Sequence, residues 1–228
     1  MTLLIVADIH GCTSCLEVIT DRIAKVDIVL IAGDITEFGN APEANEILKI
    51  FEKHQAVIAA VPGNCDRSGA RILLEQRGIS ADGRVLKLEK ALVAGAGGGN
   101  WRTGLTPYER KDEELSEAIE SAVHQAERAI RDGELGKPLI LLSHTPPFGT
   151  KADVRAGRHV GSPALRSMLD SLRPLLWVSG HIHEARSISR SGNTLIINPG
   201  PLREGKFASA QINGNCDRWQ VEAELSSG

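Results

Sequence analysis

The sequence predicts an α/β protein with two layers of β-sheet and helices on the outside. Apolar runs rich in Val, Ile and Leu recur along the chain, helical stretches lie between several of them, and the last part changes to short alternating segments. The 228 residues suffice for one substantial core, and 42% hydrophobic with 24% charged residues is ordinary for a globular protein. We therefore expect a single domain over residues 1–228.

The apolar runs show no alternation with polar residues, which is typical of strands buried on both faces. Each run ends in a polar or glycine-rich turn, so we expect seven such strands. They fall at residues 3–11, 27–34, 56–64, 91–99, 138–145, 175–183 and 194–200.

The helices are expected between these runs, at residues 13–25, 42–54, 109–132 and 162–172. In the longest of them, apolar residues recur at spacings of three and four and form one stripe. After the last buried runs, residues 185–190, 207–212 and 218–225 alternate between apolar and polar positions. We expect them to form antiparallel strands with the run at 194–200.

Charge and composition exclude some function classes. The formal net charge of −3 gives no global basic field, so attraction to nucleic acid is not indicated, and no segment is long and apolar enough for a membrane span. The N-terminal residues lack the pattern of a signal peptide, and four cysteines are too few for a disulfide scaffold. We expect a cytoplasmic protein with reduced thiols and no membrane partner.

Polar side chains gather where the predicted strands end, and ligands of open α/β sheets bind beyond the carboxyl ends of strands. Two pairs are spaced two residues apart, Asp8 with His10 and His181 with His183, so each pair is expected on one face of a strand. Carboxylate and amide oxygens with imidazoles are a ligand set for divalent metal ions. The predicted metal ligands are Asp8, His10, Asp34, Asn64, His144, His181 and His183.

The order of these blocks carries a resemblance. D-x-H, G-D, G-N-x-D, a single His and G-H-x-H resemble the ordered signature of the calcineurin-like metallophosphoesterases. The blocks are Asp8 with His10, Gly33-Asp34, Gly63-Asn64 with Asp66, His144, and Gly180-His181 with His183. The chain looks closest to small prokaryotic members that carry a GNCD motif. The resemblance implies a four-layer αββα sandwich.

The resemblance also implies two divalent metal ions. Asp8, His10 and His183 would hold the first, Asn64, His144 and His181 the second, and Asp34 would bridge them. Manganese is the first expectation, and the same ligands accept Fe, Zn, Co or Ni. Two aspartates do not cancel the charge of two divalent ions, so the site would stay positive and would attract a small anionic phosphoester.

Our hypothesis for the reaction is direct attack on phosphorus by a hydroxide that bridges the two ions, with Asp34 and Asn64 as catalytic residues. The GNCD resemblance favours phosphodiesters over phosphomonoesters. A phosphomonoesterase or a nuclease on the same site remains an alternative, although no basic stripe favours nucleic acid. A non-catalytic scaffold, as in the retromer subunit that shares this fold, is the rival from another class. The sequence leaves the oligomeric state open.

The word Gly-Asn-Cys-Asp-Arg occurs twice, at residues 63–67 and 214–218. The first copy follows a buried strand and supplies Asn64. The second lies between two alternating segments, where Asn213-Gly214 signals a hairpin turn. We interpret the second copy as a turn.

Cys65 stands where many relatives have a histidine that protonates the leaving group, and a thiol is a poor general acid near neutral pH. Either no side chain protonates the leaving group, or His159 does, unless His159 only caps or packs beside the next helix. Asn64 and Cys65, with Asn100 and Trp101 in a glycine-rich loop, are the candidate substrate-binding residues. We interpret Cys12 and Cys15 as small residues of a turn and not as a redox pair.

Overall fold

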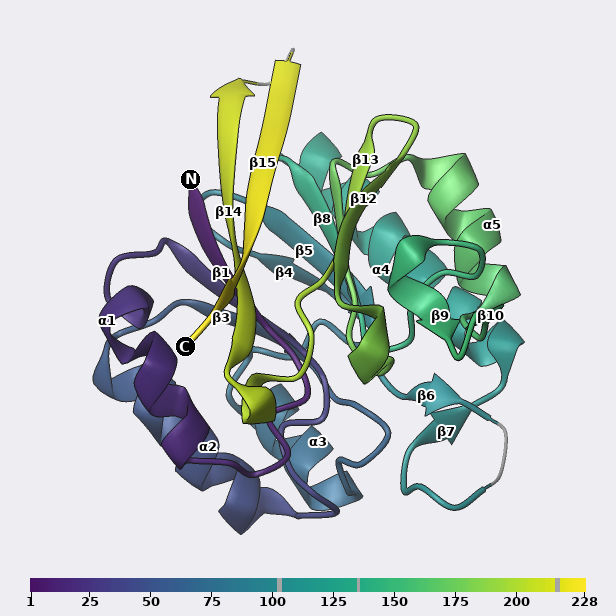
Figure 1. Ribbon diagram of the computed structural model, residues 1–228. Coiled ribbons are helices and arrows are strands. Elements are labelled where there is room, and N and C mark those ends of the chain that lie inside the picture. The colour runs from purple at the N-terminus through teal and green to yellow at the C-terminus, as the bar shows by residue number, and fades with distance from the viewer. Residues whose placement is uncertain (102–103, 135, 216–217) are drawn as a thin grey trace.

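The computed structural model describes residues 1–101, 104–134, 136–215 and 218–228, and shows two β-sheets packed face to face with helices outside (Figure 1). The first sheet has the order β15-β14-β1-β2-β3 and the second the order β12-β13-β11-β8-β5-β4. Strands of the first sheet are β1 (Thr2–Val6), β2 (Ile28–Ala32), β3 (Ile58–Val61), β14 (Lys206–Asn215) and β15 (Arg218–Ser227). Those of the second are β4 (Val85–Lys87), β5 (Leu92–Ala96), β8 (Leu139–Ser143), β11 (Leu176–Val178), β12 (Ser187–Ser191) and β13 (Thr194–Asn198).

The centre of each sheet is parallel and its margin antiparallel. In the first sheet β1, β2 and β3 run parallel, while β14 and β15 are antiparallel additions. In the second, β5, β8, β11 and β13 are parallel, and β4 and β12 pair antiparallel at the two edges. The two small ribbons are β6 (Gly99–Asn100) with β7 (Glu109–Arg110), and β9 (Val154–Arg155) with β10 (Arg158–His159).

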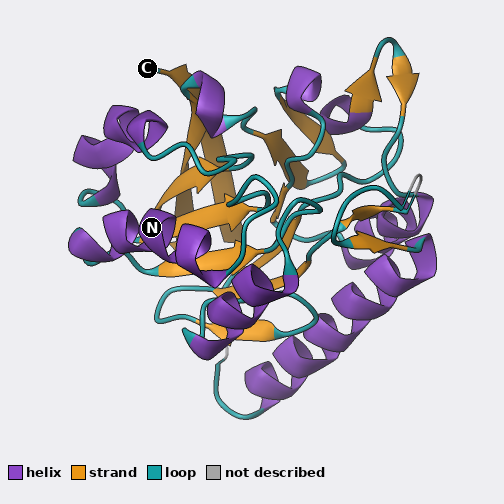
Figure 2. Cartoon of the chain, turned by 90° about the horizontal axis from the view of Figure 1, so that it is seen from below, coloured by secondary structure: helices purple, strands orange, loops and turns teal. Residues whose placement is uncertain are grey.

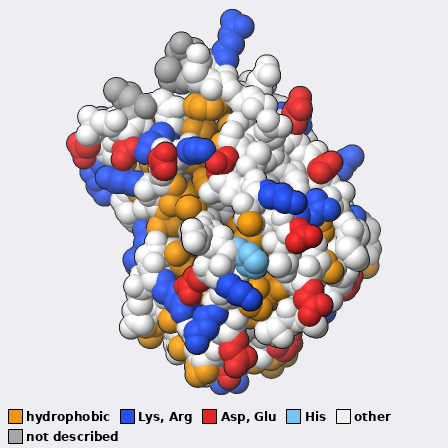
Figure 3. All heavy atoms as spheres, turned by 90° about the vertical axis from the view of Figure 1, so that its left-hand side faces the viewer, with side chains coloured by type: hydrophobic (Ala, Val, Ile, Leu, Met, Phe, Trp, Pro, Cys, Tyr) orange, Lys and Arg blue, Asp and Glu red, His pale blue; other side chains and the backbone are white. Residues whose placement is uncertain are grey.

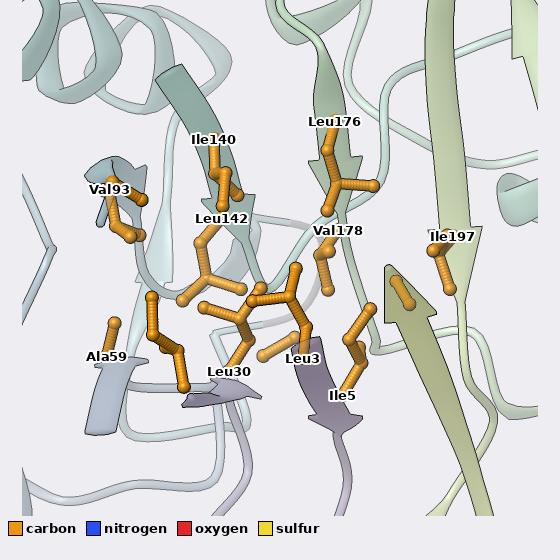
Figure 4. Packing of buried hydrophobic residues seen from close by; sticks show 14 of the residues in the cluster. Leu3, Ile5, Leu30, Ala59, Val93, Ile140, Leu142, Leu176, Val178 and Ile197 are labelled. Atoms are coloured by element: carbon orange, nitrogen blue, oxygen red, sulfur yellow. The ribbon is translucent and has the colours of Figure 1, made fainter. Parts of the chain in front are cut away.

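The apolar runs are continuous because each central strand is buried on both faces. In β1, Leu3 and Ile5 point between the sheets, where Figure 4 shows them beside residues of β8, β11 and β13. The alternate residues Leu4 and Val6 pack against helices on the other face. Successive side chains of a strand point to opposite faces. In a strand that is covered on both faces, every side chain is therefore buried, and the sequence has no alternating polar positions.

The helices form the two outer layers, as the view from below shows (Figure 2). α2 and α3 contribute to the apolar cluster on the first sheet, and α4 and α5 to the one on the second. The helices are α1 (Thr20–Ile23), α2 (Ala41–Lys53), α3 (Ser68–Gln76), α4 (Asp112–Arg131) and α5 (Pro163–Leu172). Short 3₁₀ helices lie at Ser14–Ile19, Lys151–Asp153, His183–Ala185 and Leu202–Glu204. None of the helices in the described ranges is long and apolar enough to cross a membrane.

The predicted two-sheet sandwich with outer helices is confirmed, and two local predictions are wrong. The expected helix at 13–25 is a 3₁₀ segment followed by one turn, α1. The expected turn at Asn213-Gly214 is paired strand, since Asn213 lies opposite Gln220 and Gly214 opposite Trp219. The strands continue to Asn215 because that register keeps Ile212 and Val221 together in the core. The link at 216–217, inside the second copy of Gly-Asn-Cys-Asp-Arg, lies outside the described residues, so the interpretation of that copy as a turn stays a prediction.

The expectation of reduced thiols is also wrong for one pair, because Cys12 and Cys15 form a disulfide. Their Cα atoms lie 5.4 Å apart, within the range that a disulfide bridges. The tight turn after β1, in which Cys12 N donates to Ile9 O, folds the chain back and brings the two residues together. A spacing of three residues could not distinguish this from two separate thiols.

Candidate metal centre

The predicted ligands lie together at the carboxyl ends of the central strands of both sheets. Asp8 follows β1, Asp34 follows β2 and Asn64 follows β3, whereas His144 follows β8 and the last two histidines follow β11. Because the two sheets pack face to face with these ends on one side, the loops meet over the core. The seven side chains are those of Asp8, His10, Asp34, Asn64, His144, His181 and His183.

The prediction that Asp8 and His10 share one face of a strand, and that His181 and His183 do the same, is nevertheless wrong. Asp8, His10 and His181 are not strand residues, because β1 ends at Val6 and β11 at Val178. These three residues and Asp34 have positive φ angles of 54°, 50°, 69° and 50°. Left-handed backbone is uncommon for non-glycine residues, and it turns the chain sharply beyond each strand. The side chains therefore converge through strained turns and not through strand alternation.

One half of the centre surrounds two imidazoles that face each other. His10 Nε2 lies 3.3 Å from His183 Nε2. A carboxylate accompanies each ring: Asp34 Oδ2 lies 3.7 Å from His10 Nε2, and Asp8 Oδ1 lies 3.4 Å from His183 Nε2. Two ring nitrogens at this distance need a proton or a cation to keep their lone pairs from repelling. The donor set of two imidazoles and two carboxylates fits a divalent ion.

The other half of the centre lies on the far side of Asp34. His144 is fully buried, and its Nδ1 lies 2.8 Å from Ala32 O. Because a carbonyl oxygen can only accept a hydrogen bond, Nδ1 carries a proton and donates it to this oxygen. Its Nε2 lies 3.0 Å from Asn64 Oδ1 and 3.4 Å from Asp34 Oδ2, and in the neutral ring this nitrogen carries the lone pair. A backbone partner that fixes the ring of a ligand histidine is common in metal sites. With the ring neutral, His144 Nε2 and the two oxygens offer three electron pairs to a cation.

His181 lies beside His144. Its ring packs edge to face against His144, with the ring centroids 4.9 Å apart. Its backbone N–H donates to both carboxylate oxygens of Asp8, at 3.2 Å each. Burial and the neighbouring His144 lower the pKa of His181 to about 4, so this imidazole is neutral at pH 7. A neutral imidazole is the form that binds a metal.

The carboxylates make the centre favourable for positive charge. Burial alone would raise the pKa of Asp34, but His144 and His10 hold it well below its usual range. Burial alone would lower the pKa of His144, and Asp34 instead raises it to about 9. An ionised Asp34 therefore lies between His10 and His144, and its bridging role stays a prediction.

Asn64 is held in place by the glycine-rich loop, and Cys65 faces the centre. A β-carbon at Gly99 would lie 2.9 Å from Asn64 Cβ, so only glycine allows the loop this approach. The ligand-type atoms of His10, Asp34 and Cys65 lie within 4.8 Å of one another. Burial and the charge of Asp34 raise the pKa of the Cys65 thiol far above its usual range. A thiol so hard to ionise is a poor proton donor.

The two remaining substrate-binding candidates differ in exposure. Trp101 is 62% exposed. Asn100 is half-buried, and its Oδ1 has no hydrogen bond among the described residues. Neither residue contacts a predicted metal ligand in the interactions that the structure records, so their role stays a prediction.

His159 is paired and does not cap the following helix. Its Nδ1 lies 2.7 Å from Oδ1 of Asp153, a fully buried carboxylate that also accepts from the N–H groups of Gly149, Thr150 and Gly161. The β9–β10 ribbon that carries His159 contacts the 3₁₀ turn that begins at His183. The side chain of His159 is 45% exposed. Its imidazole is oriented by Asp153, and its role as a proton donor stays a prediction.

Sequence reasoning missed three residues around the centre. Asp66 is buried and accepts from the backbone of Ile35, Thr36 and Gly63, which ties the two metal loops together. Its place in G-N-x-D was the available signal. Glu37 contacts His10, and Arg203 contacts His183. No motif marks either of them, because both contacts depend on how loops fold over the site.

Comparisons with known proteins agree with this geometry. The model of the family described as calcineurin-like phosphoesterase matches residues 1–185. The uncharacterized protein MJ1162 of Methanocaldococcus jannaschii is 33% identical over 180 residues, which are 77% of this chain and 78% of that protein. Among solved structures, TT1561 of Thermus thermophilus has a TM-score of 0.70 at 16% identity, covering 99% of this chain and 98% of that one.

Two further solved structures have the same fold. A dimetal phosphatase from Danio rerio has a TM-score of 0.61 at 14% identity, covering 100% of this chain and 98% of that one. A protein described as a novel archaeal phosphodiesterase has a TM-score of 0.51 at 15% identity, with coverage of 99% and 100%.

The fold, the donor set and the matched family together define a metal-dependent phosphoesterase. The chain belongs to the calcineurin-like phosphoesterase family, as the order of its motifs had indicated.

Proposed function

We propose that the protein is a dinuclear phosphodiesterase of small phosphoesters, with Asp34 between two divalent ions. The observation that supports it most is the double contact of Asp34: its Oδ2 lies 3.7 Å from His10 Nε2 and 3.4 Å from His144 Nε2. Each of those nitrogens faces a further electron-pair donor, His183 Nε2 or Asn64 Oδ1. One carboxylate therefore serves two donor groups.

In this proposal the first ion is held by Asp8, His10 and His183 and the second by Asn64, His144 and His181, with Asp34 shared. When bound, such a pair of ions lowers the pKa of a water molecule and neutralises the phosphoryl oxygens for in-line attack. The chain's own part is orientation. Ala32 O fixes His144, and the backbone N–H of Cys65, 2.7 Å from Asp34 Oδ1, fixes the shared carboxylate.

Cys65 bears on which residue protonates the leaving group. Since the pKa of the Cys65 thiol is raised, this residue keeps its proton and does not serve the leaving oxygen. The paired His159 is the candidate donor, because the Asp153 carboxylate fixes its Nδ1 and Nε2 takes no part in that pair. The contact of β9 with the 3₁₀ turn that begins at His183 supports this candidate, because β10, which carries His159, pairs with β9.

The preference for diesters is supported by the GNCD motif. Since no oriented acid stands at position 65, esters with good leaving groups, which need no proton, should depend least on His159. Manganese is the proposed metal, with Fe, Zn, Co and Ni as alternatives for the same ligands. A phosphomonoesterase is the second candidate, since the same two-ion arrangement serves both ester classes.

A paired assay tests the proposal. The metal-stripped chain is reconstituted with Mn, Fe, Zn, Co or Ni, its metal content is measured, and the hydrolysis of a nitrophenyl phosphodiester is compared with that of nitrophenyl phosphate. We expect close to two ions per chain and a higher kcat/KM for the diester. A higher value for the monoester supports the second candidate. Two bound ions without hydrolysis of either ester indicate a non-catalytic scaffold.

A further inference from the structure

Glu37 contacts a predicted metal ligand from outside the proposed centre. Its Oε2 lies 2.5 Å from Nδ1 of His10, on the side of the ring opposite the Nε2 that faces His183 and Asp34. His10 is buried, with 6% of its side chain exposed, whereas 49% of the Glu37 side chain is exposed. The carboxylate therefore reaches inward from the surface to one buried nitrogen.

That nitrogen has no other assigned use. His10 Nδ1 is buried and makes no hydrogen bond of suitable angle with any described residue. The Glu37 oxygen is close enough to accept its proton after a small rotation of either side chain. A neutral imidazole carries one proton on two nitrogens, so a proton held on Nδ1 leaves the lone pair on Nε2. That lone pair is what a metal ion at the proposed site needs.

His144 shows the same arrangement with a backbone partner. Its Nδ1 lies 2.8 Å from Ala32 O, and its Nε2 faces Asn64 and Asp34. The centre thus has one imidazole oriented by a carbonyl and one accompanied by a carboxylate. A carboxylate also raises the basicity of the ligand, which a neutral carbonyl does to a smaller extent.

Arg203 also lies near the Glu37 carboxylate. Its Nη1 lies 3.8 Å from Glu37 Oε2, and its Nη2 lies 3.4 Å from His183 Nδ1. The guanidinium thus spans the outer edges of the same histidine pair. An ion pair between exposed side chains contributes little to stability by itself. Its consequence here is to limit the positions that the Glu37 side chain can take.

We propose that Glu37 is a positioning residue for the first metal ion: its carboxylate keeps the His10 proton on Nδ1 and directs Nε2 toward the ion. This inference rests on the proposed function, because it concerns the same metal centre. It extends that function to a residue outside the family's metal-binding motifs, and it makes a statement about metal affinity that does not depend on substrate.

The test compares Glu37→Gln with a matched control. Glu184→Gln removes the same charge from a side chain that is 53% exposed and lies next to the centre, but Glu184 pairs with Arg155 at 3.4 Å. The metal-stripped full chain and both variants are titrated with Mn²⁺ by calorimetry. We expect Glu37→Gln to weaken the binding of one ion about 10- to 100-fold, as other outer partners of ligand histidines do, and Glu184→Gln to change it less than about 2-fold.

Two further readouts separate positioning from a structural role. The thermal midpoint of the metal-stripped chain should be the same in wild type and Glu37→Gln, because the Glu37 side chain is half exposed and buries nothing. Histidine side-chain ¹⁵N spectra should show one ring with its proton fixed on Nδ1 in the wild type, and a mixture of tautomers for that ring in Glu37→Gln. An equal Mn²⁺ affinity in the two proteins, or an unchanged tautomer, overturns the inference.

The outcomes also separate this inference from the proposed function. A wild-type chain that takes up no Mn²⁺ overturns both. A wild-type chain that binds Mn²⁺ but hydrolyses neither ester overturns the proposed function alone, and the affinity ratio still decides the role of Glu37. Equal losses in Glu37→Gln and Glu184→Gln would mean that only net charge matters, which contradicts positioning.

Discussion

Gly63 lies against Asp34 so closely that a β-carbon at position 63 would stand 2.0 Å from Asp34 Oδ1 and 2.2 Å from its backbone nitrogen. The loop after β3 and the loop after β2 therefore touch through bare backbone. The contact sets the distance between Asn64 and Asp34, because Asn64 is the next residue along the chain. The glycine of the G-N-x-D motif is required for space and not for a special φ angle.

We predict that Gly63→Ala separates these loops. The inserted methyl group must displace Asp34, which should lower the free energy of unfolding by about 1–3 kcal/mol and weaken Mn²⁺ binding at least about 10-fold. Urea unfolding and calorimetric titration measure the two effects. Gly192→Ala is the control, since no atom lies within 4 Å of its β-carbon and it tests only the strain of a positive φ. Unchanged metal binding in Gly63→Ala would contradict the prediction.

Asp34→Asn should reduce the metal content of the isolated chain to one ion or none. The amide keeps the size of the side chain and removes the charge that two histidines face. We expect hydrolysis to fall at least about 100-fold. Metal analysis after dialysis, with the ester assay, measures both. Asp170→Asn, which loses only a surface pair with Arg166, should keep wild-type metal content.

His159→Ala tests the proton donor through the leaving group. We expect kcat to fall about 10²–10⁴-fold for alkyl esters, whose leaving oxygen needs a proton, and to stay nearly constant for nitrophenyl esters. Asp153→Asn should show the same dependence in weaker form, because it leaves the ring but removes its partner at 2.7 Å. An alkyl ester that reacts equally fast with His159→Ala excludes this residue as the acid.

Reduction of the Cys12–Cys15 disulfide should destabilise the chain only moderately. The bridge spans a separation of three residues, and closing so short a loop stabilises by about 2 kcal/mol in the chain-entropy account. Thermal unfolding with and without dithiothreitol measures the difference. The double variant Cys12→Ser with Cys15→Ser should unfold like the reduced wild type and ignore the reductant. A wild-type midpoint that does not respond to dithiothreitol would show that no bridge forms in solution.

Asp27 should contribute stability that is lost in acid. A hydrogen bond from Lys90, with a second from the Thr2 N–H, lowers the pKa of Asp27 from 3.8 to about 2. A pKa that is lower in the folded chain means that the ionised form stabilises the fold. The contribution is complete above pH 3.8 and disappears as the pH falls through about 2. Because the pair is solvated, we expect about 1 kcal/mol. The unfolding free energies of wild type and Asp27→Asn should therefore converge between about pH 4 and about pH 2.

The surface gives little sign of a polyanionic partner on the face that Figure 3 shows. Lysine and arginine side chains are interspersed there with aspartate and glutamate. An electrostatic footprint for nucleic acid is a stripe of one sign. This agrees with the formal net charge of −3 and with the proposal of a small ester as substrate.

The layers of the fold could be predicted from the sequence because a strand that is buried on both faces has an uninterrupted apolar run. Runs such as residues 27–34 and 138–145 contain no alternation, and both became central parallel strands. α3 was missed because Ser68 and Gly69 follow the G-N-x-D block directly and no cap or long stripe marks its start. The residues proposed as metal ligands were predicted from the order of the motifs.

The geometry of the centre could not be predicted in the same way. Asp and His adopt left-handed backbone more often than most residues, but at few of their positions, so residue type could not identify it at Asp8 and His10. The contact between Glu37 and His10 joins residues from two loops and depends on a rotamer. The pair of Asp153 and His159 lies across a ribbon whose strands have two residues each, too short to show a pattern.

The strained turns at Asp8, His10, Asp34 and His181 have a consequence for the lifetime of the protein. Each such backbone conformation costs about 1–3 kcal/mol and has to be offset elsewhere. A ligand that binds only the native chain stabilises it and so offsets part of this strain energy. The stabilisation is about 2.7 kcal/mol when the ligand concentration is about 100 times its dissociation constant. The proposed ions would then act as folding partners as well as reagents. A chelator should hasten proteolysis of the chain, and its abundance should follow the supply of metal in its surroundings.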